Sequence, residues 1–265
     1  MENLVEVEPL REGLAGATAD TKGKILEFVW WMKKQGYAEN STIPLYSGFI
    51  RRLQKRSADI SNPESVKATI AQHWKGSMKS NAIAAYTLFL KMQGLAWQPP
   101  FCKVTRKLPF IPTEREIDSL ISACGKKTAT FLQLLKETAM RSGETNGLKW
   151  MDVDVQRQVI TMNAPEKNSN PRIFKVTNKL IAMLNALPKT SEYVFVKSQV
   201  GYRNATFYKS KRTIAKKLQN PRLLRIHFHT MRHWKATMLY HETKDILYVK
   251  QFLGHKRIDN TLFYV

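Results

Sequence analysis

Apolar residues recur at helical spacing through most of the first hundred residues of the chain. In the segment DTKGKILEFVWWMKKQG they occupy positions 25, 28, 29 and 32, which predicts a helix that starts at Asp20 or Thr21 and ends at Gly36. Similar patterns predict further helices over about 41–57, 63–73 and 78–94. Together these segments predict one helical domain over residues 21–100, preceded by an acidic tail over residues 1–20.

Four prolines interrupt this pattern in WQPPFCKVTRKLPFIP and predict a linker over residues 101–112. After the linker, Thr113 and Glu116 have the spacing of a capping box at the start of a helix. QVITMN and RIFKV then alternate like two strands, with the polar turn APEKNSNP between them. Further helical patterns cover about 128–150, 177–187, 204–218, 230–241 and 244–253. The chain is therefore predicted to be mainly α with a small β-sheet (α+β), with a second domain over residues 113–265.

The charge of the chain indicates a polyanionic partner. Its 265 residues include 43 Lys and Arg against 21 Asp and Glu, a formal net charge of +22. Both predicted domains share the excess, with 15 basic against 4 acidic residues over 21–110 and 27 against 12 over 111–265. A bound polyanion relieves such self-repulsion, so nucleic acid is the leading partner, although ribosomal and membrane-surface proteins have similar charge.

Basic side chains that could contact DNA phosphates are concentrated on the predicted helices of both domains. For each of them, a solvated basic face is the alternative explanation. The candidates are Lys33, Lys34, Arg51, Arg52, Lys55, Arg56, Lys75, Lys79, Lys209, Lys211 and Arg212.

Other features exclude several classes of protein. Cys102 and Cys124 form neither a metal-binding pair nor a disulfide framework, which indicates a reducing compartment. His227, His229 and His233 lack a cysteine or carboxylate partner at a zinc-site spacing, so we predict no metal. The N-terminal segment lacks the features of a secretory signal, and no apolar stretch reaches the roughly 20 residues that span a bilayer. We expect a soluble cytoplasmic protein, associated with the nucleoid if its partner is DNA.

Four short segments of the second domain carry candidate chemistry: TAMRSGETNGLKWMDVD, the predicted hairpin, HFHTMRH and QFLGHKRIDNTLFYV. Each of them, taken alone, has an ordinary explanation as a surface ion pair, a solvated lysine, a chance spacing or a packed aromatic. The candidate residues in chain order are Arg141, Glu144, Lys167, His229, Arg232, His255 and Tyr264.

In this order, the segments resemble the tyrosine recombinase (phage integrase) family, which includes Xer-type chromosome resolvases and archaeal integrases. The resemblance consists of AMRSGETNGLKWMD, the hairpin Lys167, HTMR, and LGHKRIDNTLFY with its tyrosine nine residues after the histidine. Ala139 replaces a glycine that is common in the family. The resemblance is strong over residues 111–264, whereas 21–100 is similar to the family's core-binding domain only in type. It implies a core-binding domain and a catalytic domain that form a clamp around double-stranded DNA.

The resemblance also implies a role for each candidate. Cleaving a phosphodiester requires a nucleophile, cations for the pentacoordinate phosphorus and an acid for the leaving oxygen. Tyr264 is expected to be the nucleophile, with Arg141 and Arg232 binding the non-bridging oxygens through planar, permanently charged guanidinium groups. His229 is expected to act as acid and base, and Lys167 to protonate the departing 5′ oxygen.

The remaining two candidates are expected in supporting roles. His255 would hydrogen-bond the phosphate or brace the pocket, and Glu144 would hold the Arg141 helix or a neighbouring histidine without acting as a catalyst. The implied product is a 3′-phosphotyrosyl link with a free 5′ hydroxyl, formed without a cofactor. The resemblance further implies a tetramer on two DNA sites, with a monomer or dimer in the absence of DNA.

Alternative functions remain open at this point. A type IB topoisomerase shares the chemistry, but usually has lysine in place of the first HxxR histidine, here His229. A catalytically silent DNA-binding integrase fragment is a second alternative, and an RNA-binding or RNA-modifying protein is a third. Family members usually continue past the tyrosine with a helix that docks on a neighbouring subunit. We therefore expect either a truncated chain or a different subunit contact.

Overall fold

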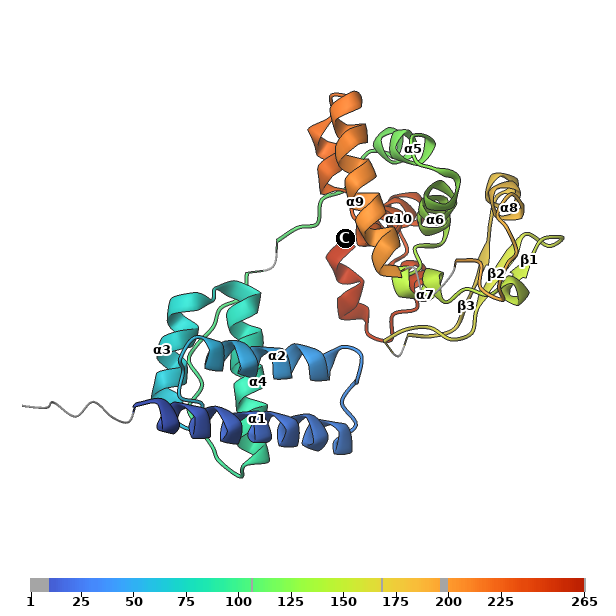
Figure 1. The fold of residues 1–265 in the computed structure, drawn as a ribbon. Helices are drawn as coiled ribbons and strands as arrows, with labels where there is room; N and C mark the ends of the chain where they lie inside the picture. The colour runs from blue at the N-terminus through green and yellow to red at the C-terminus, as the bar shows by residue number, and fades with distance from the viewer. Residues whose placement is uncertain (1–9, 106, 168, 196–199, 265) are drawn as a thin grey trace, which may run out of the picture. The chain divides into compact units, whose positions relative to one another are not determined.

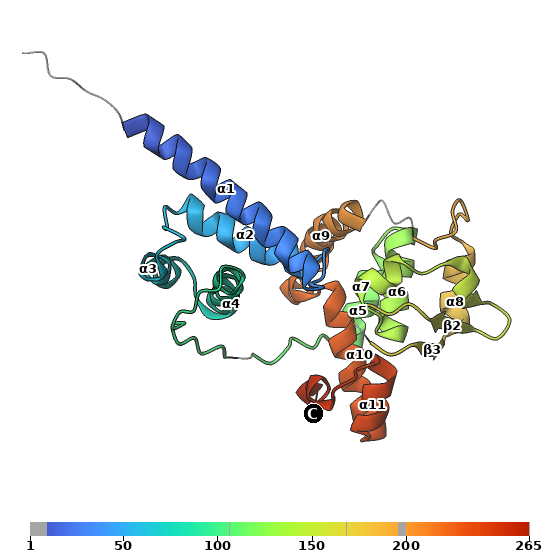
Figure 2. The same cartoon turned by 90° about the horizontal axis from the view of Figure 1, so that it is seen from below.

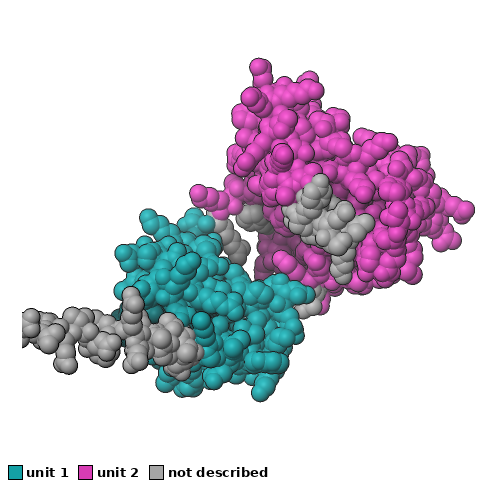
Figure 3. Space-filling view, in the orientation of Figure 1, with its two compact units in different colours: residues 1–106 teal, residues 107–265 magenta. Residues whose placement is uncertain are grey.

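The computed structural model describes residues 10–264, except 106, 168 and 196–199 (Figure 1). The chain divides into two compact units, Met1–Arg106 and Lys107–Val265 (Figure 3). The division falls within the predicted linker, residues 101–112, which contains no helix or strand among its described positions. Each unit has its own apolar core.

The described part of the first unit is built from four helices, α1 (Leu10–Lys34), α2 (Thr42–Lys55), α3 (Pro63–His73) and α4 (Gly76–Met92). Helices α1 and α2 lie side by side, and α4 packs against α2 (Figures 1 and 2). Their interface buries large aromatic side chains, among them Phe28, Phe49 and Phe89. All four predicted helices of this unit are present.

The start of α1 differs from the prediction. Asp20 and Thr21 were expected to begin the helix, yet α1 begins at Leu10 and passes through both positions. Residues 1–9 of the predicted tail lie outside the described residues, and the remainder belongs to α1. The segment LREGLAGATA contains alanine, leucine, glutamate and arginine, which are strong helix formers, and no proline. Helix propensity therefore outweighs the local capping signal.

The second unit is organised around α6 (Lys126–Thr138), whose middle residues 129–135 are all buried. Helices α5 (Glu114–Ser122), α8 (Asn178–Asn185) and α10 (Phe228–Thr243) pack against it. The capping box at the start of α5 is confirmed: Glu116 N donates to Thr113 Oγ1 at 3.2 Å, and Thr113 N donates to Glu116 Oε2 at 2.8 Å.

The predicted hairpin is confirmed as part of a three-stranded antiparallel sheet in the order β1-β2-β3. The strands are β1 (Val153–Asp154), β2 (Val159–Met162) and β3 (Arg172–Lys175), with Met162 opposite Arg172 at the end next to the loop. The short strand β1 was not predicted. In β3, Arg172 and Phe174 face the interior while Ile173 and Lys175 face solvent.

The predicted helical region over 128–150 is interrupted at Ala139. This residue has the left-handed backbone conformation (φ 52°) and ends α6. The chain turns through Met140 and Arg141 before the short helix α7 (Ser142–Asn146) and the 3₁₀ helix at Trp150–Asp152. Thr138 stabilises the turn, because its hydroxyl donates to Leu134 O at 2.7 Å and accepts from Met140 N at 3.3 Å.

The described part of the chain after α8 carries five more elements besides α10. These are α9 (Val200–Lys217), a 3₁₀ helix at Pro221–Arg225, α11 (Ile246–Leu253) and two 3₁₀ turns at Ile258–Asn260 and Leu262–Tyr264. Helix α11 ends at Gly254, whose φ of 71° is a left-handed conformation that glycine adopts without strain. Among the helices described, none is long and apolar enough to cross a bilayer.

Candidate active site

The side chain of Glu144 lies at the bottom of the candidate site and is fully buried. Its Oε2 accepts from Arg141 N at 2.8 Å, and its Oε1 pairs with Arg141 Nη1 at 2.9 Å. Burial alone would raise the pKa of Glu144, but the Arg141 amide and the Arg172 and Arg141 guanidinium groups lower it. The carboxylate is therefore ionised, and the pair is a buried ion pair rather than a surface one.

Arg172 is a residue of this site that sequence reasoning missed. Its Nη2 pairs with Glu144 Oε1 at 2.7 Å, and its Nη1 donates to Leu253 O at 2.7 Å. Its side chain is almost completely buried. The sequence signal that could have identified Arg172 is its spacing of two residues from Phe174, which places both side chains on the inner face of β3.

The hairpin loop that carries Lys167 is attached to the ion-pair cluster formed by Arg141, Glu144 and Arg172. Arg141 Nη1 donates to Ser169 Oγ at 2.7 Å and to Glu166 O at 3.3 Å. Glu166 N donates to Glu144 Oε1 at 3.2 Å. Lys167 itself is exposed and has φ 56°. Lys167 directly follows Glu166, whose backbone N–H and C=O both bond to the cluster.

Arg232 is buried, with 1% of its surface exposed. Its Nη1 donates to Ala139 O at 2.7 Å, and its Nη2 donates to Leu253 O at 2.7 Å and to His255 Nε2 at 3.0 Å. Burial, together with repulsion from Arg141 and Arg172, lowers the pKa of Arg232 to about 10. The guanidinium remains charged at neutral pH. These contacts use three of its five N–H donors.

The tautomer of His255 follows from its neighbours. Because Arg232 can only donate, Nε2 of His255 accepts, and Nδ1 carries the proton that is donated to Thr261 Oγ1 at 2.9 Å. Burial, together with the charges of Arg232 and Arg141, lowers the pKa of His255 to about 4. His255 is therefore a neutral bracing group next to Arg232.

His229 lies in the first turn of α10, and its side chain is exposed. Partial desolvation of the ring, followed by the neighbouring His233 and Arg232, lowers the pKa of His229 to about 4. The ring of His233 lies edge-on to it, with 4.7 Å between the centroids. His229 is thus neutral at pH 7 and open to a ligand.

Tyr264 is buried against an apolar cluster that includes Ala139, Leu239 and Leu253. Its hydroxyl lies 3.1 Å from Nδ1 of His233, in hydrogen-bond contact. Burial raises the pKa of the phenol, whereas Arg232 and Arg141 act in the opposite direction. The sequence interpretation assigned His229 to this phenol, but the histidine hydrogen-bonded to it in the described chain is His233.

His233 is the second residue that sequence reasoning missed. It was considered only as one of three histidines for a metal, although its spacing of four residues from His229 places both rings on one face of α10. Among the described residues, no group of three histidine, cysteine or acidic side chains is arranged to hold a metal ion.

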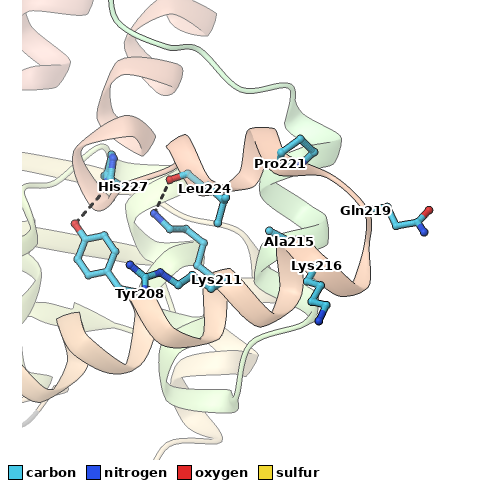
Figure 4. A pocket seen from close by; sticks show the side chains of 9 residues that line it. Tyr208, Lys211, Ala215, Lys216, Gln219, Pro221, Leu224 and His227 are labelled. Atoms are coloured by element: carbon cyan, nitrogen blue, oxygen red, sulfur yellow. Dashed lines mark hydrogen bonds between the residues drawn. The ribbon is translucent and has the colours of Figure 1, made fainter.

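One of the DNA-contact candidates is not at the surface. Lys211 is 3% exposed, and its Nζ donates to Leu224 O at 2.9 Å and Ile226 O at 2.7 Å (Figure 4). It lines a pocket of about 740 Å³, in which Tyr208 also reaches His227. Burial lowers the pKa of Lys211. Its expected role as a phosphate contact is therefore wrong for this arrangement, in which two carbonyl groups hold the ammonium inward.

The other DNA-contact candidates lie wholly or partly at the surface of their units. In the first unit, Arg52 lies over the Phe49 ring at 4.6 Å and Arg56 over the Trp74 ring at 5.2 Å, so aromatic faces orient both guanidinium groups. The exposed or partly exposed candidates are Lys33, Lys34, Arg51, Arg52, Lys55, Arg56, Lys75, Lys79, Lys209 and Arg212.

Comparison with known proteins gives a consistent result. The model of the phage integrase family matches residues 112–265. Tyrosine recombinase XerA of Thermococcus kodakarensis is 25% identical over 256 residues, covering 91% of this chain and 89% of the relative. XerA of Saccharolobus solfataricus is 26% identical over 251 residues, covering 86% of this chain and 82% of the relative.

Solved structures with the same fold include recombinases bound to DNA. The Tn1549 transposon integrase in complex with transposon right end DNA superposes with a TM-score of 0.70 at 16% identity, covering 91% of this chain and 94% of that one. A crystal structure of XerA recombinase gives a TM-score of 0.50 at 22% identity, covering 92% and 93%. At these identities, the likeness shows the fold alone.

Proposed function

This chain belongs to the phage integrase family, and from that premise we propose that it is a site-specific DNA recombinase. It would cleave and rejoin double-stranded DNA by transesterification through a 3′-phosphotyrosyl intermediate. The observation that carries the proposal is the convergence of a buried arginine, a neutral histidine and a tyrosine. Arg232 contacts both His255 and the carbonyl of Leu253, and Tyr264 belongs to the apolar cluster that contains Leu253. The relatives named tyrosine recombinase XerA support the same activity.

In the proposed reaction, Tyr264 Oη attacks the phosphorus, and the bond from phosphorus to the 5′ oxygen breaks. Charge builds up on the non-bridging oxygens, where Arg141 and Arg232 stabilise it. Both guanidinium groups are held by contacts within the chain before DNA arrives, so little reorganisation is needed during the reaction. The link retains the energy of the broken bond, and a 5′ hydroxyl can therefore reverse the step without an external energy source.

The departing 5′ oxygen needs a proton, and Lys167 is the residue that we assign to donate it. Its loop is fixed through Glu166 and Ser169 to Arg141, which we assign to the same phosphate. This attachment supports a position for the ammonium group on the leaving-group side of the phosphorus. His229, neutral and exposed, would hydrogen-bond the phosphate.

Double-stranded DNA is the partner that the charge distribution supports best. Exposed basic side chains are present on both units, and Lys209, Arg212 and Lys216 form a stripe at spacings of three and four residues along α9. We further propose that the chain assembles as a tetramer on two DNA sites.

Trapping on a nicked suicide substrate tests this function. Duplexes that carry candidate recombination sites, with a nick next to the scissile phosphate, lose the 5′-hydroxyl fragment and leave the protein attached. We expect a denaturation-resistant adduct with the native chain and none with Tyr264→Phe, although both bind the duplex equally in a mobility-shift assay. An undiminished adduct in Tyr264→Phe would exclude this tyrosine as the nucleophile.

A further inference from the structure

The Tyr264 hydroxyl lies 3.1 Å from Nδ1 of His233, within hydrogen-bond distance. His233 follows Arg232 directly in α10, so the phosphate-binding residue and the partner of the phenol share one rigid helix. The His233 and Tyr264 rings are inclined by 50° with 5.5 Å between their centroids. This arrangement points the edge of the imidazole at the oxygen atom that would attack DNA.

The surroundings of Tyr264 create a need for a proton acceptor. Tyr264 is 9% exposed and packs on Ala236, Leu239 and Val249. An apolar wall cannot take the phenolic proton, and burial disfavours the phenolate. A hydrogen-bond acceptor at the hydroxyl must therefore receive the proton as the oxygen becomes nucleophilic.

We propose that His233 is the general base that accepts the proton of Tyr264, a role that rests on the proposed recombinase function. As Tyr264 Oη forms its bond to phosphorus, the phenolic proton moves to Nδ1 of His233. The bond to the 5′ oxygen breaks, and Lys167 supplies the proton for that oxygen. In the reverse reaction, His233 returns its proton to the phenol while the 5′ hydroxyl attacks.

The protonation state of His233 fits this role. Burial, together with the adjacent charge of Arg232, lowers the pKa of His233, so the ring is neutral and can accept a proton at Nδ1. The edge-on contact places the exposed His229 ring next to the His233 ring. His229, to which the sequence interpretation assigned the acid and base role, is left to contact the phosphate.

A pair of substrates distinguishes activation of the nucleophile from protonation of the leaving group. One is the ordinary nicked duplex, and the other has sulfur in place of the bridging 5′ oxygen. A thiolate leaves without a proton, so loss of the acid is rescued by the sulfur substrate, whereas loss of the base is not. Adduct formation is followed at pH 7 under single-turnover conditions.

We expect His233→Ala to slow the adduct by roughly 10²–10⁴-fold on both substrates. Lys167→Ala should be slow on the oxygen substrate and restored on the sulfur substrate. His233→Asn can still hydrogen-bond the phenol through its amide but cannot take up the proton, so it should be as slow as His233→Ala. His241→Ala, an exposed histidine on the same helix, is the matched control and should behave like the native chain.

Three results would overturn the inference. A near-native rate for His233→Ala would remove His233 from the reaction. Recovery in His233→Asn, whose similar shape preserves packing, would show that His233 only positions the phenol. Rescue of His233→Ala by the sulfur substrate would assign it to the leaving group. If the native chain forms no adduct on either substrate, the proposed recombinase function itself fails. That outcome differs from the three above, which appear only in the His233 variants.

Discussion

Arg172 and Arg232 donate to the same backbone carbonyl, that of Leu253, each at 2.7 Å. Arg172 begins the strand that follows the Lys167 loop, and Arg232 belongs to the HxxR motif of α10. Leu253 is the last residue of α11, two positions before His255. One buried carbonyl therefore sets the positions of three parts of the candidate site relative to one another.

Replacing Glu144 by glutamine should destabilise the second unit. The change keeps the shape of the side chain but leaves Arg141 and Arg172 without their buried counter-charge, a loss that typically costs about 3–5 kcal/mol. Urea denaturation measures the difference in the free energy of unfolding. Glu242→Gln, at an exposed position of α10, is the control and should change it by less than about 0.5 kcal/mol. Equal stabilities of the two variants would contradict the buried ion pair.

Replacing Gly254 by alanine should disturb both the turn that leads into His255 and the loop that carries Lys167. Gly254 has φ 71°, and an added Cβ would lie 3.0 Å from Asn170 O and 2.8 Å from Arg172 Cδ. The left-handed conformation alone costs a non-glycine residue about 1–2 kcal/mol. We expect a lower melting temperature and slower adduct formation. Gly125→Ala, with φ −64° and open space around it, should leave adduct formation unchanged.

Replacing Arg232 by lysine should slow cleavage by at least about 10²-fold, the usual effect of losing one donor that stabilises transition-state charge. A lysine ammonium cannot reach Ala139 O, Leu253 O and a phosphate oxygen at once, because it lacks the planar fork. Single-turnover trapping measures the rate, and a mobility-shift assay verifies that DNA is still bound. A native rate in Arg232→Lys would remove this guanidinium from the phosphate.

Replacing Thr261 by valine should weaken the bracing of His255. Nδ1–H of His255 would lose its acceptor in a buried place, at a cost of about 1–3 kcal/mol. Thr261→Ser retains the hydroxyl and should lose less stability, even though it also removes a methyl group. Thermal unfolding of the two variants side by side tests the hydrogen bond. A greater loss in the serine variant would show that packing of the methyl group dominates.

The free protein should lose stability as the pH falls from about 6.5 to about 4. The folded-state pKa values of His229 and His255 are lowered to about 4, whereas an unfolded histidine has a pKa of about 6.5. Between these values the unfolded chain binds more protons, so stability is complete above pH 6.5 and declines toward pH 4. For the buried His255, the loss is at most about 3 kcal/mol.

Urea midpoints measured at several pH values without DNA test this dependence. His255→Gln should be less stable than the native chain at pH 7 but should lose less on acidification, since one of the two histidines is gone. An unchanged slope in His255→Gln would contradict its neutral, buried state in the folded protein.

The sequence was most informative where a signal is local. The Thr113–Glu116 capping box and the strands around the Lys167 loop both depend on residues a few positions apart. Arg172 could not be identified in this way, because its partners Glu144 and Leu253 are 28 and 81 positions away in the chain. Its role arises only when β3 packs against α7 and α11.

Two other differences between the sequence prediction and the structure also arise from contacts between residues that are distant in the chain. The break at Ala139 could not be read from helical periodicity, since the apolar spacing continues through it; the turn is stabilised by Arg232, which donates to Ala139 O. Lys211 looked like part of a basic surface run, but two carbonyl groups from the 3₁₀ segment and its end hold its ammonium inward. In both cases a tertiary hydrogen bond overrides the local pattern.

The cluster of Arg141, Arg172 and Arg232 around Glu144 has a consequence for the effect of ionic strength. Mobile ions screen exposed charges over about 8 Å at physiological salt, but they act much less on charges beneath the surface. In the proposed recombinase, added salt would therefore weaken the binding of the exposed lysines and arginines to the DNA backbone. It would barely change the attraction of the buried cluster for a phosphate already in the site. Salt would govern how often the protein occupies DNA, and much less how fast a bound strand is cut.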